Sequence, residues 1–451
     1  MPWPSAFRSK ATIPFALAVL ALSALVSCTT VASTTPETRA PQLTTVAAAA
    51  TPSALPRPSV EATPSPAPTA APTAAPASPV VTPSPAAEVT PSPEAAGPTL
   101  DEQTVAKLQK ILDNQVKNKD VAGLQAAVRL PSGEMWLGTA GVAEYSPDRA
   151  LDDDDQLAIA SVTKTFVAAL ILQLAEEGKI DLDAPFGRYF RDAPRKDRVT
   201  VRQLLSHTSG IYNYWANPRY GETTRAWWES PNAGGLKART HRWTYEEMMD
   251  LVKSGEFKPG TDYQYSNTNY LILGKVAEAV EGMPLHKQLR QRFFRPLGLD
   301  DTIYQPAQKP RADAAHGHWA WPGGHTDHTR DSRYVPFMAA ASIADAAGAM
   351  ASNARDLAEW SAALYGGEVL SDEMLAEMTT FRRPGNYGLG AYPAAYSGHL
   401  GIGHRGGIRG YESSMFYFPR TGVSVVLLSN QGNWAMDEPM RKLVRTVLGR
   451  K

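Results

Sequence analysis

Cysteine is almost absent from this sequence, since Cys28 is the only one among 451 residues. The folded part of the chain therefore has no internal disulfide, thiolate metal cluster or cysteine nucleophile. An excess of charge of either sign is also lacking, because lysine plus arginine and aspartate plus glutamate both number 45. No basic stripe indicates a nucleic-acid surface, so we expect no nucleic-acid partner.

The amino-terminal segment lacks the length of apolar sequence that a membrane span needs. Arg8 and Lys10 precede an apolar stretch, Thr12–Val26, that is too short to cross a bilayer comfortably. Small residues then lead to Cys28, in a pattern that resembles the lipobox of bacterial lipoproteins. We predict a signal peptide over residues 1–28, lipidation of Cys28 and a membrane-anchored domain on the extracytoplasmic side. The alternative is an ordinary cleaved signal peptide, and both predict export to the cell envelope.

Residues 29–98 are rich in proline, alanine, threonine and serine, and they repeat Thr-Pro-Ser-Pro three times. Such a composition cannot bury enough apolar surface to fold. We predict an extended tether, partly in polyproline II conformation, with a contour length of up to ~200 Å at ~3 Å per residue. Residues 99–451 remain as the folded domain.

The two ends of this domain carry matching patterns of strands and a helix. Helical spacing of apolar residues and turn-bounded apolar runs predict the elements Asp101–Asn118, Leu124–Leu130, Glu134–Gly141, Tyr411–Phe418, Gly422–Ser429 and Trp434–Leu448. The simplest architecture is α/β (α+β), with an antiparallel sheet built from both chain ends and flanked by the terminal helices. Residues 180–395 read mostly as helices and loops, which predicts a second, all-helical lobe.

The first chemical motif is Ser161-Val162-Thr163-Lys164, directly before the apolar helix predicted at Phe166–Ala175. Three residues along a helix place Ser161 and Lys164 on one face. Burial lowers the pKa of a lysine, which can then take the proton from a serine nucleophile. The pair alone is common, and the alternative is a serine N-cap with an exposed lysine.

Two further motifs follow. A tyrosine at Tyr265 next to a cationic lysine can have a lowered phenol pKa and pass a proton to a leaving group, while the Asn267 amide can hold lysine and substrate. Then come His404-Arg405-Gly406 and Gly407, whose glycines let a substrate approach the backbone at a strand edge. The backbone N–H groups of Ser161 and Gly407 would form an oxyanion hole.

The order S-x-x-K, Y-x-N, H-x-G over residues 101–450 resembles the penicillin-recognising serine hydrolases, within the group of class C β-lactamases, DD-carboxypeptidases and related esterases. Further stretches similar to this group are Leu204-Leu205-Ser206-His207-Thr208-Ser209-Gly210, Pro296-Leu297-Gly298-Leu299 and Gly410-Tyr411. The resemblance implies a five-stranded type of antiparallel sheet and a helical lobe with the site between them. It also implies Ser161 as nucleophile, Lys164 as general base, Tyr265 as proton relay, Asn267 as positioning residue and His404 as the electrostatic group of the third motif.

The third motif departs from the pattern in which a lysine and a hydroxyl residue hold a substrate carboxylate. His404 is only partly charged near neutral pH, and Arg405 cannot reproduce the geometry of a hydroxyl. Arg405, Gly406 and Arg409 stay candidate substrate-binding residues, since an arginine can bind a carboxylate bidentately. A true β-lactamase is the interpretation that this departure weakens most.

We therefore expect a monomeric serine hydrolase that works through an acyl-enzyme on an ester or amide, either a D-alanyl peptide of peptidoglycan or a small acyl compound. The alternative is a penicillin-binding or sensor module that is acylated without turnover.

We expect no cofactor and no metal site. His207 is expected to bond locally, and the close spacing of His316, His318, His325 and His328 is interpreted as a cleft-lining loop, with zinc binding as the alternative.

Overall fold

The computed structural model describes residues 97–117, 121–145, 148–219, 241–311, 314–319, 337–382 and 384–450. The predictions for residues 1–96, including the lipidation of Cys28, lie outside the described residues. None of the described helices is long and apolar enough to cross a membrane.

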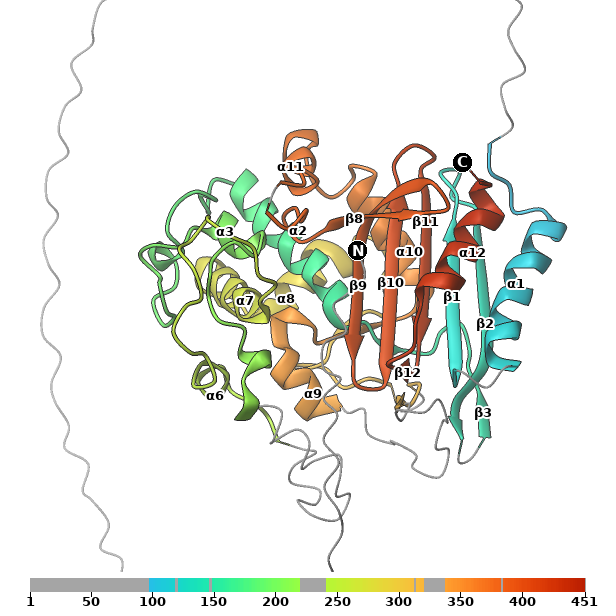
Figure 1. The fold of residues 1–451 in the computed structure, drawn as a ribbon, viewed down its shortest axis with the longest axis horizontal. Helices are drawn as coiled ribbons and strands as arrows, with labels where there is room; N and C mark the ends of the chain where they lie inside the picture. The colour runs from blue at the N-terminus through green and yellow to red at the C-terminus, as the bar shows by residue number, and fades with distance from the viewer. Residues whose placement is uncertain are drawn as a thin grey trace, which may run out of the picture. The chain divides into compact units, whose positions relative to one another are not determined.

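The centre of the described domain is a seven-stranded sheet (Figure 1). Its strands lie in the order β3-β2-β1-β11-β10-β9-β8, and every neighbouring pair is antiparallel. Their bounds are β1 Gly123–Arg129, β2 Met135–Tyr145, β3 Asp148–Ala150, β8 Tyr392–Tyr396, β9 His399–Ile408, β10 Tyr411–Phe418 and β11 Val423–Ser429. Segments from the two ends of the described domain meet within the sheet, where β1 pairs with β11. The predicted antiparallel sheet from both ends is confirmed, with β9 added beside β10 and with β3 and β8 at its edges.

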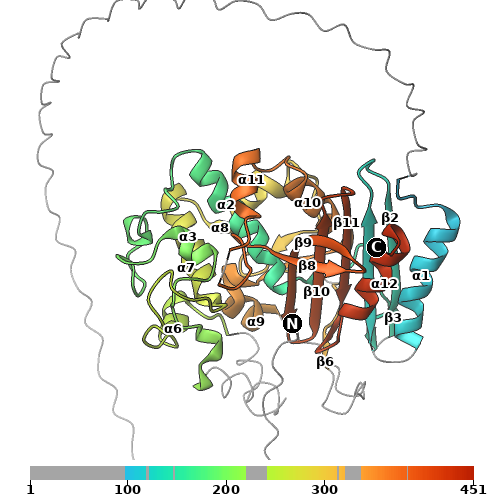
Figure 2. The same cartoon turned by 45° about the horizontal axis from the view of Figure 1, so that its top comes forward.

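Two helical layers cover the two faces of this sheet. The helices α1 (Glu102–Lys117) and α12 (Asp437–Leu448) pack on one face, as the sequence predicts, whereas α10 (Ala354–Tyr365) packs on the other (Figures 1 and 2). Strand β11 is buried on both sides, since Leu427 belongs to the core under α1 and α12 while Val426 belongs to the core under α10. Alternation of side chains along a strand produces this division.

The helical lobe lies beyond the β9 side of the sheet. It contains α3 (Val201–Leu205), α6 (Tyr245–Met249), α7 (Asn267–Glu281) and α8 (Leu285–Leu289). A separate short sheet, β4-β7-β5 (Leu157–Ala158, Met350–Ser352, Ile303–Tyr304), contacts β10 through β4. Both views place α2 (Thr163–Glu176) between this lobe and the sheet (Figures 1 and 2). Because α2 is apolar around its circumference, burial on all sides stabilises it there.

The core around α2 fixes its position firmly. Phe166 stacks on Trp360 of α10 with ring centroids 3.9 Å apart, and the indole N–H of Trp360 donates to the Thr165 hydroxyl at 2.9 Å. Burying two aromatic rings of this size stabilises the fold by several kcal/mol, on the order of 2 kcal/mol for each side chain. The amino terminus of α2 is thus held against the sheet at β9.

Candidate active site

Ser161 lies in a 3-10 turn, Ala160–Val162, that leads directly into α2. The turn begins with Ala160 at a φ of 45°, a left-handed conformation that costs an L-residue about 1–2 kcal/mol. The turn packs against β9 and β10, where the Ser413 hydroxyl donates to the Ile159 carbonyl at 2.7 Å. The strained turn therefore holds the half-buried Ser161 at the edge between sheet and helical lobe.

Lys164 lies one turn along the helix and is completely buried. Its ammonium nitrogen, Nζ, is 3.0 Å from Ser161 Oγ, 2.9 Å from Asn267 Oδ1 and 2.6 Å from the Ala347 carbonyl oxygen. Burial lowers the pKa of Lys164 well below its ordinary value, because desolvation disfavours the charged form. The structure thus brings the two predicted residues together, and the alternative of an exposed lysine is wrong.

Tyr265 and Asn267 reach the same point from the start of α7. The Lys164 nitrogen lies 4.9 Å from the centroid of the Tyr265 ring. Burial raises the pKa of the Tyr265 phenol well above its ordinary value, and the nearby Ser161 hydroxyl opposes only part of this increase. The expectation of a lowered phenol pKa is therefore wrong. Its premise was a cationic neighbour, whereas burial disfavours charge on Lys164 and on the phenol alike.

The Tyr265 hydroxyl is buried, and none of the described residues is aligned to form a hydrogen bond with it. A buried hydroxyl without a partner costs about 1–3 kcal/mol. Such orphaned groups are rare in folded proteins and commonly mark a functional site. The hydroxyl is a neutral proton donor, and its position beside Ser161 leaves it free for a bound substrate.

His207 holds this second motif in place, a role that its sequence did not reveal. We expected local bonding, but its Nδ1 accepts hydrogen bonds from the Ser266 backbone N–H at 3.2 Å and from the Asn269 amide at 3.3 Å. Its ring also packs 4.2 Å from that of Tyr265, centroid to centroid. The ring is fully buried, and burial lowers its pKa well below the ordinary value, so His207 is a neutral support for the motif.

His404 lies on the opposite wall, on the face of β9 that is turned toward Lys164. Its Nε2 accepts from the Tyr387 hydroxyl at 2.9 Å, and its Nδ1–H donates to the Arg405 carbonyl, which fixes the tautomer. Burial and the nearby Lys164 lower the pKa of His404 to about 3. The ring is therefore neutral near pH 7. Tyr387, from the loop before β8, has no motif that could have identified it.

Gly406 brings β9 into contact with the serine turn. A Cβ atom added to Gly406 would lie 2.7 Å from the Ser161 backbone nitrogen and 2.4 Å from the Ile159 carbonyl oxygen. Only a glycine permits this approach. Gly407 follows, and its backbone is exposed. The predicted oxyanion-hole residues Ser161 and Gly407 thus lie beside this close contact between strand and turn.

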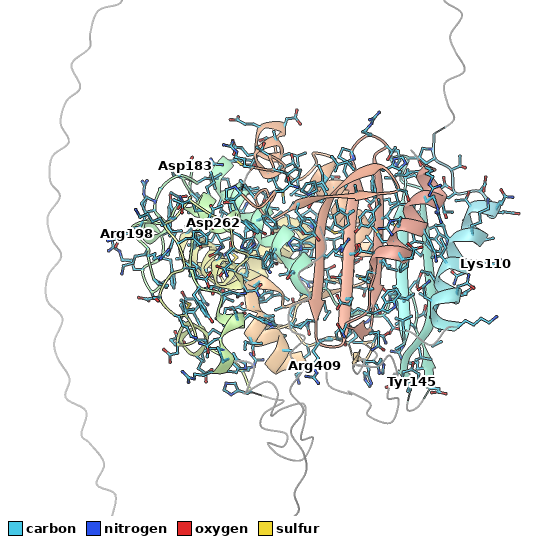
Figure 3. The ribbon with its side chains drawn as sticks, in the orientation of Figure 1. Lys110, Tyr145, Asp183, Arg198, Asp262 and Arg409 are labelled. Carbon is cyan, nitrogen blue, oxygen red and sulfur yellow. The ribbon has the colours of Figure 1, made fainter. Side chains whose placement is uncertain are left out.

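Arg405 points away from this site, which corrects its prediction as a substrate ligand. Successive side chains of a strand point to opposite faces, so Arg405 lies on the face opposite His404. Its guanidinium donates to the Tyr396 hydroxyl and forms an ion pair with Asp437 at the start of α12. Arg409 lies beyond the end of β9, in the hairpin to β10 (Figure 3).

Of the four histidines of the predicted loop, His316 and His318 lie within the described residues. His316 Nδ1 lies 3.1 Å from a Glu144 carboxylate oxygen, and the His318 ring packs edge-on against Tyr145. His325 and His328 lie outside the described residues. The described part of the cluster is bound to β2 and is separate from Ser161.

A buried lysine bonded to a serine, between an antiparallel sheet and a helical lobe, defines a serine hydrolase of the β-lactamase type. A family model described as Beta-lactamase matches residues 108–449, and the chain belongs to this family. Among curated relatives it is 26% identical over 305 residues to penicillin-binding protein 4* of Bacillus subtilis, covering 64% of either chain. It is 29% identical over 214 residues to esterase EstB of Burkholderia gladioli, covering 46% of this chain and 53% of the esterase.

Solved structures give more complete coverage. The D-amino acid amidase of Ochrobactrum anthropi SV3, complexed with L-phenylalanine amide, superposes with a TM-score of 0.65 at 28% identity, covering 77% of this chain and 99% of the amidase. A D-stereospecific amidohydrolase from Streptomyces sp. reaches a TM-score of 0.64 at 30% identity with the same coverage. The chain spans between about a third and two thirds of the length of the curated relatives it matches. The predicted family, fold and serine-hydrolase class are confirmed.

Proposed function

We propose that this protein hydrolyses an ester or amide through an acyl-enzyme formed on Ser161, with Lys164 as general base. The observation that carries this proposal is the 3.0 Å distance between Lys164 Nζ and Ser161 Oγ at a completely buried lysine. In the neutral form, the two N–H bonds of Lys164 donate to Asn267 Oδ1 and the Ala347 carbonyl, which are pure acceptors. The lone pair is then directed at the Ser161 hydroxyl, whose proton it can accept.

The chemical steps use residues of both lobes. Ser161 Oγ forms a bond to the substrate carbonyl carbon while its proton passes to Lys164, and the carbonyl oxygen becomes an oxyanion bound by the N–H groups of Ser161 and Gly407. Collapse breaks the bond to the leaving group, which takes the proton held by Lys164, either directly or through the Tyr265 hydroxyl, which Lys164 then reprotonates. Water attacks the ester carbonyl carbon while Lys164 takes a proton from it, and Lys164 returns that proton to Ser161 Oγ as the bond to the acid breaks.

The substrate is an amide or ester of small size, with a D-alanyl peptide or a small acyl compound as the predicted classes. The similarity to a D-amino acid amidase and to a D-stereospecific amidohydrolase supports an amide next to a D-centre. A substrate carboxylate is not required by this site, since Arg405 is engaged by Tyr396 and Asp437.

The proposal is tested with a fluorophosphonate probe, which labels activated serines, and a panel of p-nitrophenyl esters, nitrocefin and D-Ala-D-Ala peptides. Ser161→Ala should lose all labelling and at least about 10⁶-fold in activity, because it removes the nucleophile itself. Ser132→Ala, an exposed serine in the turn before β2, is the matched control and should label fully. Labelling of folded Ser161→Ala equal to that of the unmodified protein would refute the proposal.

The second candidate function is a penicillin-binding or sensor module that stops at the acyl-enzyme. One observation favours it: burial keeps the Tyr265 phenol protonated, so it cannot activate the water for deacylation. A fluorescent β-lactam distinguishes the two functions. Stoichiometric, lasting label without steady-state hydrolysis of any substrate in the panel indicates the sensor, whereas turnover indicates the hydrolase.

We also propose that the protein is an exported lipoprotein, anchored through Cys28 and carried on the tether of residues 29–98. The support is the sequence pattern alone, in which the single cysteine follows an apolar stretch and small residues. Metabolic labelling with a fatty-acid analogue should mark the full chain, and the label should vanish in Cys28→Ala. Persistence of the label in that variant contradicts the anchor.

A further inference from the structure

Glu412 at the start of β10 occupies an unusual position beside the candidate site. It pairs across the sheet with Gly407 of β9. A Cβ atom added to Gly407 would lie 2.9 Å from Glu412 Oε2 and 3.3 Å from Oε1. The carboxylate therefore lies over Gly407, in the space that a side chain would otherwise fill. Glycine at this position lets the carboxylate extend across β9 toward the strand's far edge.

None of the described strands pairs with that far edge over this part of β9. Strand β8 pairs with β9 only between His399 and Gly403, so within the described residues the segment from His404 to Ile408 has a strand partner on one side alone. Gly406 in this segment contacts the backbone of Ser161, and Gly407 is exposed. Gly406 and Gly407 are consecutive, so a substrate that lies along this edge with its carbonyl carbon at Ser161 would pass on the order of 10 Å from the Glu412 carboxylate.

Within the described ranges, the Glu412 carboxylate has a hydrogen-bond donor but no cation in contact. Its Oε1 accepts the Asn433 backbone N–H at 3.0 Å, and no basic group among the described residues forms an ion pair with it. Arg405, the basic residue whose charge acts on it, is engaged by Tyr396 and Asp437. Burial raises the pKa of Glu412 to about 7, although that arginine and the Asn433 N–H oppose the increase. A mostly buried carboxylate without a counter-ion is costly unless a ligand supplies the charge.

We propose that Glu412 binds an ammonium group on the acyl half of the substrate, which rests on the proposed hydrolase function. The substrate class is then an amide or ester of an amino acid or short peptide with a free amine near the reacting carbonyl. Of its two oxygens, Oε1 is held by Asn433, which orients Oε2 over Gly407 for an N⁺–H···O⁻ bond. The ammonium would approach from the side of β9 that faces away from Lys164, so the two amines stay apart.

The test compares D-phenylalanine p-nitroanilide with its N-acetyl derivative, on the full chain. The unmodified protein should prefer the free amine, and Glu412→Gln should reduce the ratio of the two kcat/KM values by about tenfold or more, the fold-change expected for one charge-assisted hydrogen bond. Glu412→Asp, which keeps the charge but shortens the side chain, should retain part of the preference. Glu438→Gln, an exposed carboxyl on α12, is the matched control and should leave the ratio unchanged.

The outcomes separate the two proposals. Hydrolysis of both compounds with a ratio that Glu412→Gln does not change overturns the role of Glu412 and leaves the hydrolase proposal intact. Failure to hydrolyse either compound, together with no fluorophosphonate label on Ser161, overturns the hydrolase proposal itself. Label on Ser161 with preference for the N-acetyl compound also overturns the ammonium site. Far-UV circular dichroism of each variant checks its fold, and Glu412→Asp provides the answer if Glu412→Gln fails to fold.

Discussion

The two faces of strand β9 differ in how their side chains carry charge. On the face toward α2, His404 is buried with both ring nitrogens bonded, and its lowered pKa keeps it neutral. On the opposite face, Arg405 is paired with Asp437, and both side chains are partly exposed. Glu412 lies on that second face as well. Burial favours neutral groups where proton transfer is proposed, while partial exposure permits charges where recognition is proposed.

This comparison also explains why one motif serves two purposes. A strand directs consecutive residues to opposite faces, so His404-Arg405-Gly406-Gly407 contributes alternately to the reaction site and to the outer surface. The glycines on the two faces differ accordingly. Gly406 meets rigid backbone atoms of Ile159 and Ser161, whereas Gly407 meets only the end of a flexible side chain.

After that of Ser161→Ala, the largest effect is expected for Lys164→Met, which removes the buried base. Activity should fall by about 10²–10⁴-fold, the usual contribution of a general base, as measured by kcat/KM on a p-nitrophenyl ester. Lys110→Met, an exposed lysine on α1 that points into solvent (Figure 3), is the control. Activity of Lys164→Met within threefold of the unmodified protein would transfer the base role to another residue.

The same variant has a pH signature. The folded pKa of Lys164 is lowered, so between that value and the unfolded pKa near 10.5 the unfolded chain binds more protons than the folded one. Stability of the unmodified protein should therefore rise with pH across this window. Urea unfolding measures the free energy of unfolding of Lys164→Met relative to that of the unmodified protein. This relative stability should be higher at pH 7 than at pH 10. A difference that does not depend on pH would contradict burial as the cause.

The second prediction compares the substitutions Gly406→Ala and Gly407→Ala. Gly406→Ala places a Cβ 2.4 Å from the Ile159 carbonyl oxygen and 2.7 Å from the Ser161 nitrogen, so the serine turn must move. We expect about 1–3 kcal/mol of destabilisation from overpacking and roughly a 10²-fold loss of kcat/KM from misplacement. Gly407→Ala should change the free energy of unfolding by only about 0.5 kcal/mol, because the Glu412 side chain can move aside. Equal losses of stability and of kcat/KM in Gly406→Ala and Gly407→Ala would contradict the proposed difference between the two faces of β9.

The third effect concerns the titration of Glu412. Its folded pKa of about 7 lies above the ordinary value of 4.5, so the stability it contributes is present below pH 4.5 and is lost as pH rises through 7. Glu412→Gln does not titrate and should gain about 2 kcal/mol relative to the unmodified protein between pH 5 and pH 8, after allowance for partial exposure. Chemical unfolding at both pH values measures this gain. Saturating amine ligand should reduce it, because binding favours the carboxylate.

The sequence allowed the inner face to be predicted better than the outer one. Spacing along a helix brings Ser161 and Lys164 together whatever surrounds them, and their contact is short-range. Asn267 was identified by motif order, and it bonds Lys164 as expected of a positioning residue. The Ala347 carbonyl could not be identified, because a backbone acceptor 183 residues away has no residue-type signal.

The predictions for Tyr265 and Arg405 are wrong for two physical reasons, which are burial and strand register. Tyr265 has a raised pKa because the surrounding lobe desolvates it, and no local sequence shows how deeply a tyrosine is buried. The motif indicates Arg405 as a substrate ligand only if all of its residues face one surface. Strand alternation alone already separates it from His404, but its partner Asp437 lies 32 residues away on a terminal helix.

The smallest effect is expected for Arg405→Met, and it tests whether the outer face serves stability or substrate binding. The variant loses an ion pair whose side chains are 35% and 54% exposed and the hydrogen bonds to the Tyr396 hydroxyl. Solvent screens such a pair, so we expect about 1 kcal/mol of destabilisation in urea unfolding. Asp437→Asn should produce a similar loss, and the double variant should lose less than the sum, because both changes remove one interaction. KM for substrates with a carboxylate should change no more than KM for their amide analogues. A selective increase in KM for the carboxylate compounds would restore Arg405 as a substrate ligand and remove the contrast between the two faces of β9.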